Sequence, residues 1–207
     1  PAIEDEAIED TYSVYGMSRL NNGEIYYLLA GKSARFFKAL NVDGLLSLRS
    51  FNVLLFFLIV LYTVRSIPAR AVALPFLISP QIWYIFSYCT SDALALFICF
   101  LAGCELVRPG SQLNKALESD TVIKRILPTL SIALLLGVLF LLKKNYYPFI
   151  ALFYFCLLLR IIKSDSFGSR STTVFRIIIL TVLAVGFAGT RIAMDYYVNG
   201  PERQEKI

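Results

Sequence analysis

The sequence predicts an all-α protein: a polytopic transmembrane bundle of about six spans, with an outer-face loop that carries an amphipathic interfacial helix. Of the 207 residues, 57% are hydrophobic and 17% are charged, whereas soluble domains have roughly 25% charged residues. The apolar residues also gather in runs of about the ~20 residues that cross a ~30 Å hydrocarbon core, where a helix satisfies its own backbone. Together these observations indicate an integral membrane protein.

The chain opens with an acidic stretch, residues 1–10, which holds five carboxylates and no cation. A run of like charges is ordinarily a solvated segment. Because several membrane-length apolar runs follow it, the acidic stretch has a second interpretation, a catalytic loop held at a membrane surface. The chain starts at Pro1 without a signal segment, and we interpret it as a fragment or a processed chain.

A helix over residues 25–40 is predicted from its periodicity. One face collects apolar residues and the other collects cations. The apolar face holds Ile25, Tyr26, Leu29, Phe36, Phe37 and Leu40, and the basic face holds Lys32, Arg35 and Lys38. Such a helix is suited to the headgroup layer, the alternative being an ordinary helix packed on protein. Residues 1–43 therefore form one outer-face unit.

The membrane bundle is predicted to occupy residues 44–193, and residues 194–207 begin a further outer-face loop or tail. The spans are 44–64, 71–86, 93–107, 126–142, 146–162 and 174–193. Between them lie a tight basic turn at 65–70, a mixed-charge loop at 108–125 and a polar loop at 163–173. In the last span, Gly186 and Gly189 are interpreted as small residues for helix packing.

The distribution of cations predicts the orientation. One set of loops is rich in cations, and the other holds few, chiefly Lys143 and Lys144. The positive-inside rule makes the first set cytoplasmic. The acidic stretch, the basic helix, Asp92 and the lysine pair then share the outer face.

Metal and cofactor chemistry has little support in the sequence. Histidine is absent, and the four cysteines lack Cys-x-x-Cys spacing, so we predict no zinc site and no cofactor. The carboxylates of the acidic stretch are a ligand type that Mg²⁺ or Mn²⁺ accepts, although nothing fixes a geometry. No nucleic-acid partner is predicted.

Short motifs follow one another in a recognisable order. They are Asp5-Glu6-Ala7, then Tyr26-Tyr27-Leu28-Leu29, then Leu48-Arg49, and finally Pro80 through Asp92-Ala93-Leu94. In this order the chain resembles the N-terminal half of polytopic glycosyltransferases of the GT-C class, the relatives of protein O-mannosyltransferases and of other polyprenyl-phosphate-dependent transferases. The span that precedes the Asp-Glu pair in that family, and the C-terminal part of its fold, are absent from this sequence. Whether this chain alone is active therefore stays open.

The resemblance implies an inverting transfer of a sugar from a polyprenyl-phosphate-linked donor to a glycan, lipid or protein acceptor at the outer membrane face. Asp5 would be the general base, with Glu6 second in line. Lys143, Lys144 and Arg35 would hold the lipid phosphate, and Asp92 would orient a substrate hydroxyl or pair with a lysine. Carboxylates that take a proton and cations that stabilise a departing phosphate suit this chemistry. The expected location is the inner membrane of a bacterial cell envelope.

Simpler interpretations stand beside these roles. Asp92 is equally suited to cap the following helix, and Lys143 and Lys144 to snorkel to the interface. Arg35 and its neighbours suit contact with anionic membrane lipids. The alternative functions are a carrier or flippase for lipid-linked saccharides and a non-catalytic membrane subunit. A carrier is disfavoured because the spans are nearly free of ionisable residues.

Overall fold

The computed structural model describes residues 24–142, 144–162 and 167–199, and in these ranges every regular element is a helix. Four of the helices are long and apolar enough to cross a membrane, and two bent helix pairs raise the number of candidate spans to as many as six. The chain is therefore an all-α, multi-pass membrane bundle, as the sequence predicts.

The elements follow the chain in a simple order. They are α2 (Glu24–Ala39), α3 (Gly44–Arg65), α4 (Ile67–Ile78), α5 (Pro80–Ser87), α6 (Ser91–Val107), α7 (Gln112–Glu118), α8 (Val122–Leu141), the 3-10 turn η1 (Lys144–Tyr146), α9 (Tyr147–Ile162) and α10 (Phe167–Asn199).

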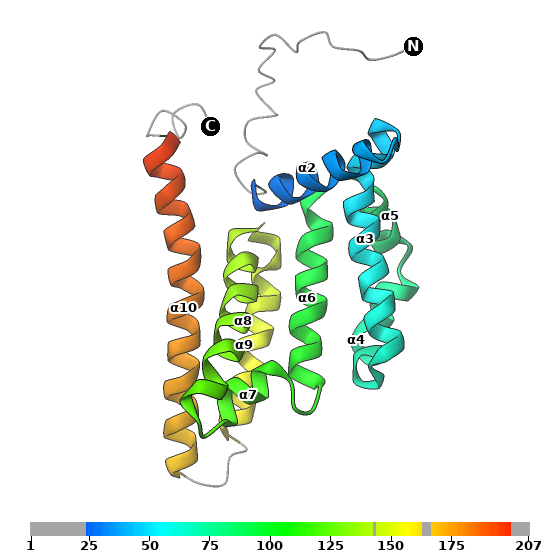
Figure 1. Cartoon of the computed structure of the whole chain (residues 1–207). Helices are drawn as coiled ribbons and strands as arrows, with labels where there is room; N and C mark the ends of the chain where they lie inside the picture. Colours follow the sequence, from blue (N-terminus) through cyan, green and yellow to red (C-terminus); the bar gives the residue numbers. More distant parts are fainter. Residues whose placement is uncertain (1–23, 143, 163–166, 200–207) are drawn as a thin grey trace.

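The long helices run side by side, and their connections lie at two opposite ends of the bundle (Figure 1). The α2 end holds α2, the α5–α6 connection, η1 and the last turns of α10. The α7 end holds α7, the α3–α4 turn and the first turns of α10. This division matches the two sets of loops that the cations separate, and the positive-inside rule makes the α2 end the predicted outer face.

Helix α2 lies across its end of the bundle and packs against α3 and α6 (Figure 1). Tyr26 and Ala30 are buried there, whereas Phe36 and Leu40 remain exposed. The three cations of its basic face are also exposed. The helix therefore packs on protein along one side and presents apolar and basic side chains along the others, the composition of an interfacial helix.

The predicted span 71–86 is formed by two helices with a sharp bend between them. Helices α4 and α5 meet at Ser79 with a bend of 82°. Ser79 is extended (φ −80°, ψ 114°) because the ring of Pro80 disfavours a helical conformation in the preceding residue. Pro75, by contrast, remains inside α4.

Three predicted connections also differ from the structure. The turn at 65–70 shrinks to Ser66, because α4 begins at Ile67 with Pro68 in its first turn, where a helix tolerates proline. The loop at 108–125 contains α7. The part of the predicted loop 163–173 from Phe167 onward is helical, and α10 extends past 193 to Asn199. No proline interrupts this helix, and tertiary contacts outweigh the weak helix propensity of its Ser and Thr residues.

Helix α7 is fastened to three other helices by hydrogen bonds. The backbone N–H of Leu113 donates to Glu105 Oε2 of α6 at 3.0 Å. Arg160 of α9 donates to Asn114 Oδ1 and Glu118 Oε1, at 2.6 and 2.8 Å. Arg176 of α10 donates to the carbonyl oxygen of Leu117. These contacts hold a seven-residue helix that is too short to be stable alone.

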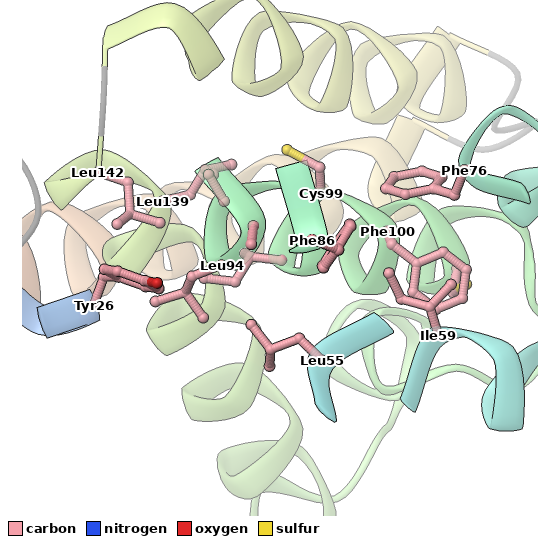
Figure 2. Close-up of a cluster of buried hydrophobic side chains, with 14 of the residues drawn as sticks. Tyr26, Leu55, Ile59, Phe76, Phe86, Leu94, Cys99, Phe100, Leu139 and Leu142 are labelled. Atoms are coloured by element: carbon pink, nitrogen blue, oxygen red, sulfur yellow. The ribbon is translucent and has the colours of Figure 1, made fainter. Parts of the chain in front are cut away.

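Two clusters of buried side chains form the core. The first contains side chains from each of the helices α2 through α6, together with parts of α8 and α9. Figure 2 shows this cluster around Leu55, Ile59, Phe86 and Phe100. The second contains side chains from each of the helices α7 through α10, together with Ala102 of α6. In the four single-helix spans, between 17% and 33% of the residues in the apolar window are buried. The rest of these apolar surfaces faces outward, as a lipid environment requires.

Glycines support two close helix contacts, although not the two that the sequence suggests. Among the described residues, no atom lies within 4 Å of the position of a Cβ on Gly186 or Gly189, so their assignment to helix packing was wrong. A Cβ on Gly103 would lie 2.8 Å from Val72 Cγ1, and one on Gly137 would lie 2.7 Å from Phe187 Cδ1. Small residues therefore permit close approach of α6 to α4 and of α8 to α10.

Candidate functional site at the 88–92 junction

The polar residues of the α2 end converge on the 88–92 junction, the segment of residues 88–92 that connects α5 to α6. Side chains from α2, α3 and η1 reach this segment. Its own residues are Tyr88, Cys89, Thr90, Ser91 and Asp92. The junction is thus the place where five elements of the bundle meet.

Asn52 anchors the junction from α3. Its side chain is fully buried, and Nδ2 donates to the carbonyl oxygens of Tyr88 and Thr90, the second at 3.2 Å. Each hydrogen bond of this kind contributes roughly 0.5–1.5 kcal/mol. The amide adds to the local backbone bonds of the junction, in which the N–H groups of Thr90 and Ala93 donate to the carbonyl oxygens of Tyr88 and Thr90. Asn52 Oδ1 accepts no hydrogen bond from the described residues.

Tyr26 reaches the junction from α2. Its ring is fully buried and its hydroxyl donates to Cys89 Sγ at 3.4 Å. Burial and the contact with Cys89 raise the pKa of the Tyr26 phenol, so the group stays protonated and remains a hydrogen-bond donor. The ring also packs near Phe51 of α3, with 5.9 Å between centroids. The start of α2 is fixed to the bundle in this way.

Asp92 is the carboxylate of the site, and two hydroxyl groups face it. Thr90 Oγ1 donates to Oδ2 at 3.1 Å, and the hydroxyl of Tyr146 donates to Oδ1 at 3.2 Å. The side chain is half-buried. Thr90, and not Asp92, is the N-cap residue of α6, and its Oγ1 accepts from the N–H of Asp92. The Asp92 carboxylate therefore has no capping role, which leaves a positioned hydrogen-bond acceptor.

Some of the predicted site residues lie inside the part of the chain that the structure describes, and others lie outside it. Asp5, Glu6 and Lys143 lie outside the described residues. Lys144 is exposed in η1, two residues before the tyrosine that contacts Asp92. Arg35 is exposed on α2, about 14 Å along the helix axis from Tyr26 at 1.5 Å per residue. The structure therefore brings Asp92 together with the turn that holds Lys144, and Arg35 lies farther along α2 at the same end of the bundle.

No group of three or more His, Cys, Asp or Glu side chains is arranged to hold a metal ion within the described ranges. The acidic stretch, whose carboxylates are the ligand type for Mg²⁺ or Mn²⁺, lies outside those ranges. What the junction offers is hydrogen-bond chemistry: a carboxylate held by two hydroxyls, with a lysine in the adjoining turn. Such a group can orient a substrate hydroxyl or pair with a cation.

Sequence reasoning missed three residues of the site. Asn52 is a polar residue inside an apolar run, and that alone was a usable signal, because intramembrane polar residues need partners. Tyr26 and Tyr146 gave no such signal, since aromatic residues are common at membrane interfaces. Their partners lie 63 and 54 residues away in the chain.

Comparisons with known proteins identify no relative of the chain. No protein-family model, curated protein or solved structure matches the chain. The case for a function consequently rests on the residues of the site and on the order of the sequence motifs.

Proposed function

We propose that the chain is a membrane glycosyltransferase, or the N-terminal portion of one, that transfers a sugar with inversion from a polyprenyl-phosphate-linked donor at the outer membrane face. The observation that carries the proposal is the Asp92 carboxylate, held by Thr90 and Tyr146 at the same end of the bundle as the turn of Lys144. A carboxylate and cations at one membrane face are the groups that this chemistry needs.

The proposed reaction has one displacement step. Asp5, with Glu6 as second choice, takes the proton from an acceptor hydroxyl. The hydroxyl oxygen then forms a bond to the anomeric carbon on the face opposite the phosphate. The bond between that carbon and the phosphate oxygen breaks, and its electron pair leaves with the polyprenyl phosphate. Lys143 and Lys144 stabilise the phosphate charge as it develops.

Asp92 has a positioning role in this scheme. A carboxylate that accepts two hydrogen bonds from the protein retains lone pairs for a third. It can therefore orient a sugar or acceptor hydroxyl at the entrance to α6. Arg35 would assist from α2 by attracting the anionic donor along the membrane surface.

The distribution of ionisable residues supports an enzyme over a carrier. In the described spans most of these side chains lie near helix ends, as Arg49 and Arg65 do in α3 and Asp92 and Glu105 do in α6. Arg176 lies farther inside α10, where it donates to the carbonyl oxygen of Leu117 in α7. A carrier for charged lipid-linked saccharides is expected to keep ionisable groups near the middle of the membrane, along a pathway.

The deciding experiment measures sugar transfer in membranes that contain the full-length protein and a radiolabelled polyprenyl-phosphate sugar. Asp5→Asn should abolish transfer, because the amide cannot accept the proton. Asp10→Asn, which changes another carboxylate of the same acidic stretch, should retain wild-type transfer. Wild-type rates in Asp5→Asn, at equal expression, would remove Asp5 from the mechanism.

The phosphate contacts are tested through donor affinity. The double variant Lys143→Ala, Lys144→Ala should raise the donor KM more than tenfold, since each lost charge-assisted contact is worth roughly 1.5–3 kcal/mol. Lys124→Ala, an exposed cation at the start of α8, is the control. If transfer is absent from wild type but lipid-linked saccharide crosses the bilayer, the flippase alternative replaces the enzyme.

A further inference from the structure

Arg49 forms an unusual contact at the α2 end of α3. Its guanidinium carbon lies 5.1 Å from the centre of the Tyr88 ring. Arg49 is five residues from the start of α3, about 8 Å along the helix axis, a distance over which a long arginine side chain can reach the headgroup layer by snorkelling. The side chain is half-exposed. A cation stacked on a ring at this depth is held in place without being buried.

The ring under Arg49 belongs to an exposed aromatic pair. The rings of Tyr84 and Tyr88 lie 4.5 Å apart, at an interplanar angle of 37°. The two residues are 57% and 45% exposed. The bend of 82° between α4 and α5 turns this aromatic segment away from the axis of α4. The pair is therefore reachable from the bilayer without entry into the bundle.

The guanidinium of Arg49 retains its hydrogen-bonding edge. No carboxylate of the described residues forms an ion pair with it, whereas Arg108 and Arg160 at the α7 end each pair with a glutamate. Stacking uses the face of the guanidinium and leaves its N–H groups directed outward in the plane. Those groups form the fork that binds phosphate oxygens in pairs.

We propose that Arg49, Tyr84 and Tyr88 form a binding site for the headgroup of an anionic phospholipid from the surrounding bilayer. The phosphate accepts hydrogen bonds from the edge of the Arg49 guanidinium, and the Tyr88 ring, which packs against the Tyr84 ring, fixes the orientation of the guanidinium. This site is independent of the proposed sugar transfer, since it needs neither the donor nor Asp92.

The test compares lipid retention by native mass spectrometry of the full chain in detergent. The probes are phosphatidylglycerol and phosphatidylcholine with identical acyl chains. Arg49→Gln should weaken retention of phosphatidylglycerol roughly tenfold, and Arg49→Lys should weaken it less, because the charge remains and the planar fork is lost. Arg65→Gln removes an exposed cation from the opposite end of the same helix and serves as the matched control.

The proposal requires that phosphatidylcholine retention stay unchanged in every variant. It is overturned if Arg49→Gln retains phosphatidylglycerol as wild type does, or loses it no more than Arg65→Gln. An equal loss of both lipids would also overturn it, because that result marks lost packing. A parallel measurement with undecaprenyl phosphate separates the sources: a loss confined to that lipid would assign Arg49 to the sugar donor and overturn the phospholipid site.

Discussion

The close contact between α8 and α10 permits a quantitative prediction from one added methyl group. A Cβ on Gly137 would lie 2.7 Å from Phe187 Cδ1 and 3.0 Å from the backbone oxygen of Ala184. The phenyl ring can shift, but the backbone oxygen belongs to a packed helix, so the two helices must separate. Overpacking of this kind costs roughly 1–3 kcal/mol. Gly137→Ala should therefore destabilise the bundle despite its better helix propensity.

Gly186→Ala provides the matched control. It makes the same chemical change in a long helix, and no atom of the part of the chain that the structure describes lies within 4 Å of the added Cβ. Both variants share the propensity gain of about 1 kcal/mol, so their difference isolates the packing cost. Thermal unfolding in detergent, followed with a thiol-reactive fluorophore that reports exposure of the buried Cys99 and Cys104, measures it. We expect Gly137→Ala to melt roughly 5 °C below Gly186→Ala, and equal melting temperatures would refute the reasoning.

Further predictions concern the junction, α7 and pH. Asn52→Leu should lower the free energy of unfolding by roughly 1–3 kcal/mol, because it removes the two hydrogen bonds by which the buried amide holds the junction, whereas the exposed Asn145→Leu should stay within about 0.5 kcal/mol of wild type in the same melt. Arg176→Gln should speed proteinase K cleavage within α7, because the carbonyl at its end loses its donor, and Lys124→Gln should not. Burial raises the pKa of the Tyr26 phenol above its usual value of 10.0. The unfolded chain therefore loses that proton first, and stability should fall as pH rises above about 10. Tyr26→Phe should remove that part of the slope, and an unchanged slope would contradict the assignment.

The spans that the sequence predicted well are those whose information is local. An apolar run of sufficient length predicts α3, α8 and α9 within a few residues, because lipid excludes every other backbone arrangement. The α4–α5 bend was harder to predict. Pro75 and Pro80 carry the same local signal, yet only Pro80 lies at a helix break, and the packing of neighbouring helices decides which proline a span tolerates.

The candidate site divides in the same way. Asp92 was identifiable from the sequence because it opens the motif Asp92-Ala93-Leu94 at the start of an apolar run. Its partner Tyr146 was not, since their contact depends on how α6 and η1 come together. Helix α7 was missed for a similar reason. Its seven residues give almost no periodic signal, and the arginines that hold it lie on α9 and α10.

The bend between α4 and α5 also affects the surrounding bilayer. Helix α4 has 12 residues and rises about 18 Å, whereas α3 beside it has 22 residues and rises about 33 Å. A hydrocarbon layer of about 30 Å is too thick for the shorter helix, and bilayers relieve such hydrophobic mismatch by local thinning. On the opposite flank, the 33 residues of α10 exceed the layer. The protein should therefore impose a thickness gradient across its own width, with the thinnest lipid next to α5.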